Sequence, residues 1–236
     1  EKPEQRGRSR FTYGHWSNPK KVALYYDAIF VDDSPMLRRL ILLYVGLVLY
    51  GLSSAMMVRA GLGLDPWNAL HEGISLRLNV SFGTVIIGVG ALLMLLWIPL
   101  RQRPGIGTIS NVVIIGLAAD AALMFLPQPA SLAVRVGMLI AAITLNGIAS
   151  GMYIGAGLGP GPRDGLMTGL AARSGWSIRL TRTGIEISVL VLGWLLGGTI
   201  GIGTIFYALA IGVIIDVTLP MFQAMARDPA RASFRA

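Results

Sequence analysis

Long apolar segments, separated by short polar ones, run through most of this chain. Six stretches are apolar enough to form membrane helices, at about residues 40–58, 82–100, 106–127, 136–156, 183–200 and 202–223. A helix needs roughly 20 predominantly apolar residues to cross the hydrocarbon core of a bilayer. The runs are continuous rather than alternating in polarity, which excludes a transmembrane barrel. The pattern therefore predicts an all-α, polytopic helical membrane protein with about six transmembrane helices.

Two short segments of similar amino-acid sequence interrupt this pattern. They read "GLGLDPWNAL" at 61–70 and "GLGPGPRDGL" at 157–166. Proline suits the first turn of a helix, and glycine before it allows a sharp bend. The helices that would follow, at 66–80 and 162–176, would rise only about 22 Å and are too short to cross alone. We expect each to be a half-helix after a Gly/Pro break.

The two breaks belong to an internal repeat with an offset of 96 residues. At this offset "GLG" at 61–63 meets "GLG" at 157–159, and "GIGTI" at 105–109 meets "GIGTI" at 201–205. The matched residues include Gly, Pro, Ser, Arg and Asp, which shared hydrophobicity cannot explain. The sequence therefore predicts two tandem membrane repeats, at 36–127 and 128–225, with a basic N-terminal tail at 1–35 and a C-terminal tail at 226–236.

Positive charge indicates how the repeats are oriented. Three crossings in each unit would invert the second copy relative to the first. Arg101 and Arg103 lie in a turn of the first unit whose equivalent, "GGTIG", has no basic residue, while the region after the first span is richer in arginine in the second unit. With a cytoplasmic N-terminus, all basic residues except Arg59, Arg77 and Arg135 fall inside. We prefer inverted repeats with both termini cytoplasmic. The alternative is eight crossings with parallel units.

Composition narrows the class of protein further. The chain of 236 residues is 54% hydrophobic and only 14% charged, and it carries a formal net charge of +8. Because the lysines all lie in the first 21 residues and most arginines flank apolar runs, the charge indicates a membrane rather than a nucleic-acid partner. The N-terminal tail is either disordered or, around 19–30, a surface helix. Cysteine is absent, so no thiolate nucleophile or Cys-ligated metal is available.

Three sequence segments of this chain resemble those of a known family. They are "GLGLDPWNALHEGIS", "LLWIPLRQRPGIGTISNVVIIGLAAD" and "GAGLGPGPRDGLMTGLA". Together they resemble the YczE-like integral membrane proteins, which are related to the YitT membrane family. The resemblance covers about residues 40–223, and we expect no counterpart of the soluble C-terminal domain that many YitT proteins carry. It implies a multi-pass protein of the bacterial plasma membrane and implies little about activity.

The breaks are the candidate binding site. Free N–H groups at the start of a half-helix favour an anion, and broken helices at the centre of inverted repeats bind the solutes of secondary transporters. We expect Arg163 to pair with the negative group of a small anionic or zwitterionic solute. The other expected substrate-binding residues are Gly61, Gly63, Asn68, His71, Gly157, Gly159 and Asp164. The competing interpretation is that Arg163 and Asp164 neutralise each other while the glycines pack helices.

Asp120 and Asp216 occupy the same place in the two repeats. A carboxylate inside a membrane costs about 2.5–3.5 kcal/mol on insertion scales. The pair could couple transport to a proton or cation, or could instead reach the interface or cap a neighbouring helix. We expect Arg182 and Glu186 to form a helix-surface or interfacial ion pair. We expect the glycines to pack helices, namely Gly147, Gly151, Gly155, Gly193 and Gly197.

The leading functional hypothesis is a transporter or permease that works by alternating access. The alternative is a non-transporting membrane partner that stabilises or regulates another membrane or biosynthetic complex. We expect no enzyme, because neither a zinc-peptidase nor a phosphate-loop motif occurs, and we expect no metal or other cofactor. The expected partners are the lipid bilayer, a small-molecule solute, and a second copy of the chain or a partner membrane protein.

Overall fold

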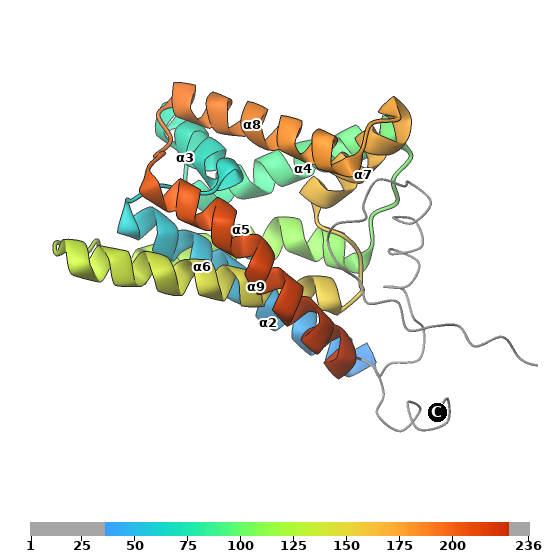
Figure 1. Ribbon diagram of the computed structural model, residues 1–236, viewed down its shortest axis with the longest axis horizontal. Helices are drawn as coiled ribbons and strands as arrows, with labels where there is room; N and C mark the ends of the chain where they lie inside the picture. Colours follow the sequence, from blue (N-terminus) through green and yellow to red (C-terminus); the bar gives the residue numbers. More distant parts are fainter. Residues whose placement is uncertain (1–35, 227–236) are drawn as a thin grey trace, which may run out of the picture.

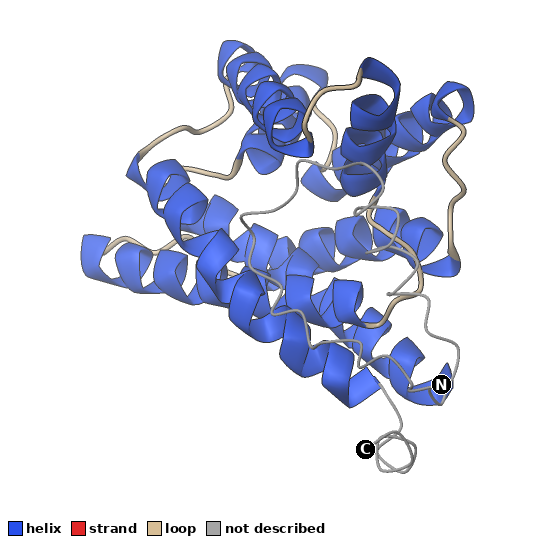
Figure 2. Cartoon of the chain, turned by 45° about the vertical axis from the view of Figure 1, so that its right-hand side comes forward, coloured by secondary structure: helices blue, strands red, loops and turns tan. Residues whose placement is uncertain are grey.

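The computed structural model describes residues 36–226, and this part of the chain is helical without strands (Figure 2). The first half contains α2 (Met36–Ala60), α3 (Pro66–Leu78), α4 (Phe82–Leu100) and α5 (Ile106–Phe125). The second half contains α6 (Leu132–Gly155), α7 (Pro162–Ser174), α8 (Ile178–Leu196) and α9 (Ile202–Ala226). The predictions for the N-terminal tail at 1–35 and for the C-terminal tail beyond residue 226 lie outside the described residues.

Five of the described helices are long and apolar enough to cross a membrane, namely α2, α4, α5, α6 and α9. The prediction of a polytopic helical membrane protein is therefore confirmed. The expected sixth span at 183–200 differs from the structure. Helix α8 begins earlier, at Ile178, so it includes Arg179, Arg182 and Glu186 in its first half. It ends at Leu196 because Gly197 adopts a φ of 101°, a left-handed conformation that stops a helix.

Both Gly/Pro breaks have the same backbone shape. The glycines of the two "GLG" motifs all have positive φ: Gly61 57°, Gly63 120°, Gly157 64° and Gly159 128°. Each following short helix begins at its proline and has 13 residues, ending before Asn79 or Gly175 in the left-handed region. Positive φ is strained for residues with a Cβ, so glycine is what permits both bends.

The helices form two groups, which lie below and above one another in Figure 1. The lower group contains α2 and α6, which pack along each other and are flanked by α5 and α9. The upper group contains α3, α4, α7 and α8. Within it the short helices are exchanged between halves: α3 packs mainly on α8, and α7 packs mainly on α4. Each half of the chain is therefore packed against the other rather than folded separately.

Two arginine contacts show that α2 and α6 are antiparallel. Arg39, near the start of α2, donates to the carbonyl oxygens of Ala156 (2.8 Å) and Gly157 (2.6 Å), just after α6 ends. Arg135, near the start of α6, donates to those of Ala60 and Gly61, both at 2.6 Å, where α2 ends. These two sets of contacts are related by the 96-residue offset, with the halves exchanged. Each arginine satisfies carbonyl groups that a helix end leaves without partners.

Glycines permit the close approach of helices, as predicted. A Cβ on Gly147, Gly151 or Gly155 of α6 would meet Ile214, Thr218 or Phe222 of α9 at 3.0 Å or less. Gly193 of α8 lies equally close to the backbone of α3. Small residues at this spacing let membrane helices approach backbone to backbone. Gly197 is the exception, since none of the described residues comes within 4 Å of a Cβ added there and it ends α8 instead of packing.

Candidate functional site

A cavity of about 540 Å³ lies where the two breaks meet. Its wall includes the start of α3, with Asp65, Pro66 and Trp67, and the segment 159–164 that leads into α7. Residues from α2, α4, α5, α6, α8 and α9 complete the wall, so both halves of the chain contribute to it. Cavities of this size are typical of small-molecule sites.

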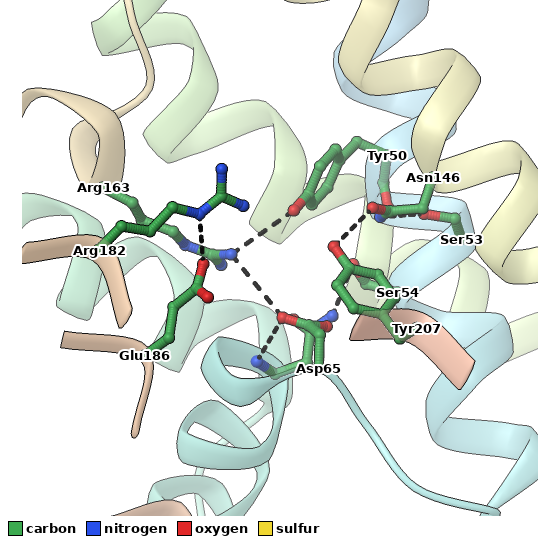
Figure 3. A network of polar contacts seen from close by, with 10 residues as sticks. Tyr50, Ser53, Ser54, Asp65, Asn146, Arg163, Arg182, Glu186 and Tyr207 are labelled. Carbon is green, nitrogen blue, oxygen red and sulfur yellow. Dashed lines mark hydrogen bonds and ion pairs between the residues drawn. The ribbon is translucent and has the colours of Figure 1, made fainter. Parts of the chain in front are cut away.

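Arg163 projects from the first turn of α7 into this cavity (Figure 3). Its Nη1 atom is 4.0 Å from Oδ1 of Asp65 and donates to the Tyr50 hydroxyl at 3.5 Å. Its guanidinium carbon lies 5.0 Å from the centre of the Trp67 ring. The side chain keeps 22% of its exposure, compared with 3% for that of Asp65. Arg163 is thus held by three groups from the other half of the chain and still reaches the open space.

Asp65 is the main functional candidate that sequence reasoning missed. It is the N-cap residue of α3, where its side chain accepts from the backbone N–H of Asn68 at 3.3 Å. It lies in the linker between α2 and α3, outside the spanning helices. Burial raises the pKa of its carboxyl group, and the nearby Arg163 guanidinium opposes that shift. An Asp directly before the Pro of a helix start is an N-cap signal that could have identified it.

The predicted site residues fall into two sets. His71, Gly159, Arg163 and Asp164 line the cavity. Gly61, Gly63 and Gly157 instead form the bends of the breaks, and Asn68 is buried beside the cavity, where it donates to Ser54 Oγ at 3.2 Å.

Asp120 and Asp216 are not brought to the cavity. Asp120 accepts from Ser81 Oγ at 2.5 Å and from the backbone N–H of Gly83 at 2.6 Å, so it caps the start of α4. Asp216 is exposed on α9. The capping interpretation therefore accounts for Asp120, and the proposed coupling role of the two carboxylates stays a prediction.

Helix α8 supplies a charged wall to the cavity. Arg179, Arg182 and Glu186 all line it, and Arg182 Nε lies 2.9 Å from Glu186 Oε1. The expected ion pair is present, but it belongs to the cavity rather than to a plain helix surface. At the 96-residue offset, the corresponding residues of α4 are Gly83, Ile86 and Gly90. The two halves therefore differ in charge where α8 faces the cavity.

A second polar network extends from the cavity into the helix pair α2 and α6 (Figure 3). Asn146 donates to Ser53 Oγ at 2.8 Å, and the hydroxyl of Tyr207, a cavity residue, donates to Asn146 Oδ1 at 3.0 Å. Sequence reasoning missed these residues because isolated polar side chains inside apolar runs give no spacing signal. Buried polar groups need such partners. Among residues 36–226, no cluster of three or more His, Asp or Glu side chains could hold a metal ion.

Comparison with known proteins confirms the family resemblance. Residues 37–220 match the model described as "Family of unknown function (DUF6198)". An "Uncharacterized protein" of Haemophilus influenzae is 35% identical over 80% of this chain and 86% of its own length. The "Uncharacterized membrane protein YczE" of Bacillus subtilis is 32% identical over 75% of this chain and 83% of its own. No solved structure matches the chain significantly. The relation to the YitT family stays a prediction.

Proposed function

The chain belongs to the family of unknown function DUF6198, and we propose that this member is a transporter of a small anionic or zwitterionic solute. It would work by alternating access in the bacterial plasma membrane, with both termini cytoplasmic. The observation that carries the proposal is the cavity of about 540 Å³ between the two breaks, with Arg163 in its wall. Solute sites of secondary transporters lie at such broken helices.

The arrangement of the halves supports alternating access through inverted repeats. Helices α2 and α6, which correspond at the 96-residue offset, run antiparallel and exchange the contacts of Arg39 and Arg135. Helices α3 and α7 each pack on the other half. Transporters with this construction move one repeat against the other around a fixed central site.

The walls of the cavity support a solute rather than a packing role. A structural cavity in a membrane bundle would be apolar, because buried charge is costly and is avoided where no function needs it. Here the wall contains charged side chains from α7 and α8 and the hydroxyls of Tyr50 and Tyr207. These groups can orient a polar molecule while the apolar residues of α4 and α5 surround it.

A ligand screen followed by reconstitution tests the proposal. We would measure thermal unfolding of the purified chain with amino acids and small carboxylates, then uptake of stabilising compounds into proteoliposomes. We expect specific stabilisation and uptake, both lost in Arg163→Ala and kept in Arg77→Ala, an exposed arginine outside the cavity wall. If a compound stabilises the protein but is not taken up, the transport proposal fails. In that case, a non-transporting membrane partner becomes the better interpretation.

A further inference from the structure

The cavity wall carries equal numbers of acidic and basic side chains. The arginines are Arg163, Arg179 and Arg182, and the carboxylates are Asp65, Asp164 and Glu186. A site for a simple anion would need an excess of positive charge, because electrostatic complementarity between site and ligand decides which partner is rejected. A balanced wall suits a solute that is neutral overall but carries both charges.

Free hydrogen-bonding capacity of both kinds lies at the first break. Oδ2 of Asp65, Nε1 of Trp67 and Nδ1 of His71 are buried and have no hydrogen-bond partner among residues 36–226. All three residues line the cavity and are at least nine-tenths buried. A carboxylate oxygen accepts and an indole N–H donates. Because a buried polar atom without a partner is destabilising, a solute that supplies both a donor and an acceptor gains affinity here.

The pair formed by Arg163 and Asp65 leaves room for such a solute. Their closest atoms are 4.0 Å apart, beyond the usual N–H···O distance of about 2.7–3.2 Å. A carboxylate can therefore reach Arg163, and an ammonium group can reach Asp65, without first breaking a close hydrogen bond. The Trp67 ring lies 5.0 Å from the Arg163 guanidinium carbon and the Tyr50 hydroxyl accepts from Arg163 Nη1 at 3.5 Å, so both residues hold Arg163 in position for a carboxylate.

From these three observations, we propose that the solute is a zwitterion whose carboxylate binds Arg163 and whose ammonium group binds Asp65. The inference rests on the proposed transport function and narrows its solute class, because simple anions are rejected by the carboxylates of the wall. The ligand class is a small amino-acid-like or betaine-like molecule.

Matched ligands test the charge requirement. The probes are the proteinogenic amino acids and glycine betaine, together with ethylamine and propionate, which each lack one charged group of alanine. We would measure ligand-dependent unfolding temperature and dissociation constants for the full chain. We expect at least one zwitterion to bind at least tenfold more tightly than its single-charge analogue. Asp65→Asn and Arg163→Gln should each weaken that binding at least tenfold, whereas Arg77→Gln should leave it unchanged.

The possible results distinguish failure of the zwitterion proposal from failure of the transport proposal. If propionate and alanine bind equally well and both need Arg163, the proposal of a zwitterionic solute is overturned. The proposal of a transporter would then remain, with an anion as its solute. Binding of the amine alone, dependent on Asp65, would likewise overturn the zwitterion proposal. No binding of any probe would overturn both the zwitterion and the proposed function. The side-chain amide in Asp65→Asn keeps an oxygen that can accept from the N–H of Asn68, so α3 should stay capped. The unfolding temperature of Asp65→Asn without ligand must therefore stay near that of the parent chain.

Two helix–helix interfaces, called seams here, border the cavity. The first seam lies between α4 and α5 and is closed: a Cβ on Gly83 would overlap the carbonyl oxygen of Gly116, and Asp120 accepts from the N–H of Gly83. The second seam lies between α8 and α9 and is open, since α8 is not among the helices packed against α9. Residues Arg179 and Ile215 on its two sides line the cavity.

At the 96-residue offset the second seam differs from the first in having a basic residue as well as an acidic one. Gly83, Gly116 and Asp120 become Arg179, Gly212 and Asp216. In the open seam no atom of the described part of the chain lies within 4 Å of a Cβ added to Gly212, and Arg179 and Asp216 are both exposed. An unpaired carboxylate within a spanning helix is unfavourable in lipid. We infer that Arg179 and Asp216 form an ion pair when the second seam closes over the cavity.

Disulfide trapping tests this ion pair, because the chain has no cysteine of its own. In the closed first seam, Ile87 and Gly116 are in contact, since a Cβ on Gly116 would lie 2.6 Å from Cγ1 of Ile87. At the 96-residue offset the corresponding residues of the second seam are Thr183 and Gly212. The double variant Thr183→Cys/Gly212→Cys should cross-link on oxidation when its seam closes. We expect Arg179→Gln or Asp216→Asn to lower the yield at least threefold. The exchange Arg179→Asp/Asp216→Arg should restore it, and Arg173→Gln should not change it. No cross-link, or a yield independent of these charges, would overturn the ion pair and leave the transport proposal to its own test.

Discussion

The guanidinium carbon of Arg163 lies 5.0 Å from the centre of the Trp67 ring, although 96 residues separate them. The two residues occupy the same position in their respective halves, directly after the proline that starts each short helix. Equivalent first turns of the two halves therefore meet at the cavity. Because one turn contributes a cation and the other an aromatic ring, the site is asymmetric even where the backbone repeats.

Replacing the ring of Trp67 should weaken ligand binding through Arg163. A cation over an indole face is worth about 0.5–2 kcal/mol, so we expect Trp67→Leu to raise the dissociation constant of a stabilising solute roughly 2–30-fold. Trp67→Phe keeps an aromatic face and should lose less. Isothermal titration of both variants would measure the difference. Equal affinities in the two variants would show that the ring does not act through its face.

Arg39 and Arg135 should stabilise the fold to similar extents. Each donates two hydrogen bonds from a charged group to carbonyls at the end of a helix in the other half. A hydrogen bond to a charged group contributes about 1.5–3 kcal/mol, so Arg39→Ala and Arg135→Ala should each lower the free energy of unfolding by at least that amount. Denaturant titration in mixed micelles measures this. Arg77→Ala, which removes only exposed contacts, is the matched control. Variants as stable as the parent would contradict the role of these contacts.

Two glycines of α8 should differ sharply in their tolerance of alanine. A Cβ on Gly193 would lie 2.6 Å from the backbone nitrogen of Leu70, whereas within residues 36–226 no atom lies within 4 Å of one on Gly184. Overpacking typically costs about 1–3 kcal/mol. We therefore expect Gly193→Ala to be destabilised by that amount and to separate α3 from α8, while Gly184→Ala should remain as stable as the parent or become more stable. Thermal unfolding of the two variants side by side would test the packing of α3 on α8.

Asp120 and Asp216 should have unequal effects on stability despite their equivalent positions. Asp120 accepts two hydrogen bonds at the start of α4, while Asp216 is exposed. Removing the acceptor in Asp120→Ala should cost about 1–3 kcal/mol of unfolding free energy. Asp216→Ala should cost nothing measurable by the same assay. Equal destabilisation by the two substitutions would mean that Asp216 has a partner in the membrane that this conformation lacks.

Single cysteines distinguish the inverted arrangement from eight parallel crossings. Gln102 lies between α4 and α5, and Gln128 lies between α5 and α6. In the inverted arrangement with a cytoplasmic N-terminus, Gln102→Cys should react only from the cytoplasmic side and Gln128→Cys only from outside. Labelling of intact cells with an impermeant maleimide measures this directly. The opposite pattern is expected for eight crossings and would overturn the inverted topology.

The local features of the breaks were predictable, whereas the composition of the site was only partly so. Glycine and proline act through their own backbone, so "GLG" followed by a proline predicts a bend and a short helix without knowledge of any neighbour. Sequence reasoning could therefore select Arg163, His71 and Asp164. Asp65 was missed as a cavity residue because its role depends on Arg163, which lies far away in the sequence.

Equivalent positions in the two halves do not decide the surroundings of a residue, for the same reason. Asp120 and Asp216 match in sequence, yet one caps a helix and the other is exposed, because Ser81 and Gly83 lie against the first and the open second seam leaves the other unpaired. Likewise Arg182 and Glu186 have the spacing of a surface ion pair, and only the position of α8 beside the cavity makes them part of the wall.

The sequence by itself determined that the chain is a helical membrane protein and that each Gly/Pro break leads into a short helix. These properties follow from the length of apolar runs and from residues that act on their own backbone. Only the tertiary structure decided that α3 and α7 pack on the opposite halves, that Asp65 lies opposite Arg163, and that one seam is closed and the other open. Those features depend on contacts between residues far apart in the chain, and such contacts leave no periodic pattern for local reasoning to detect.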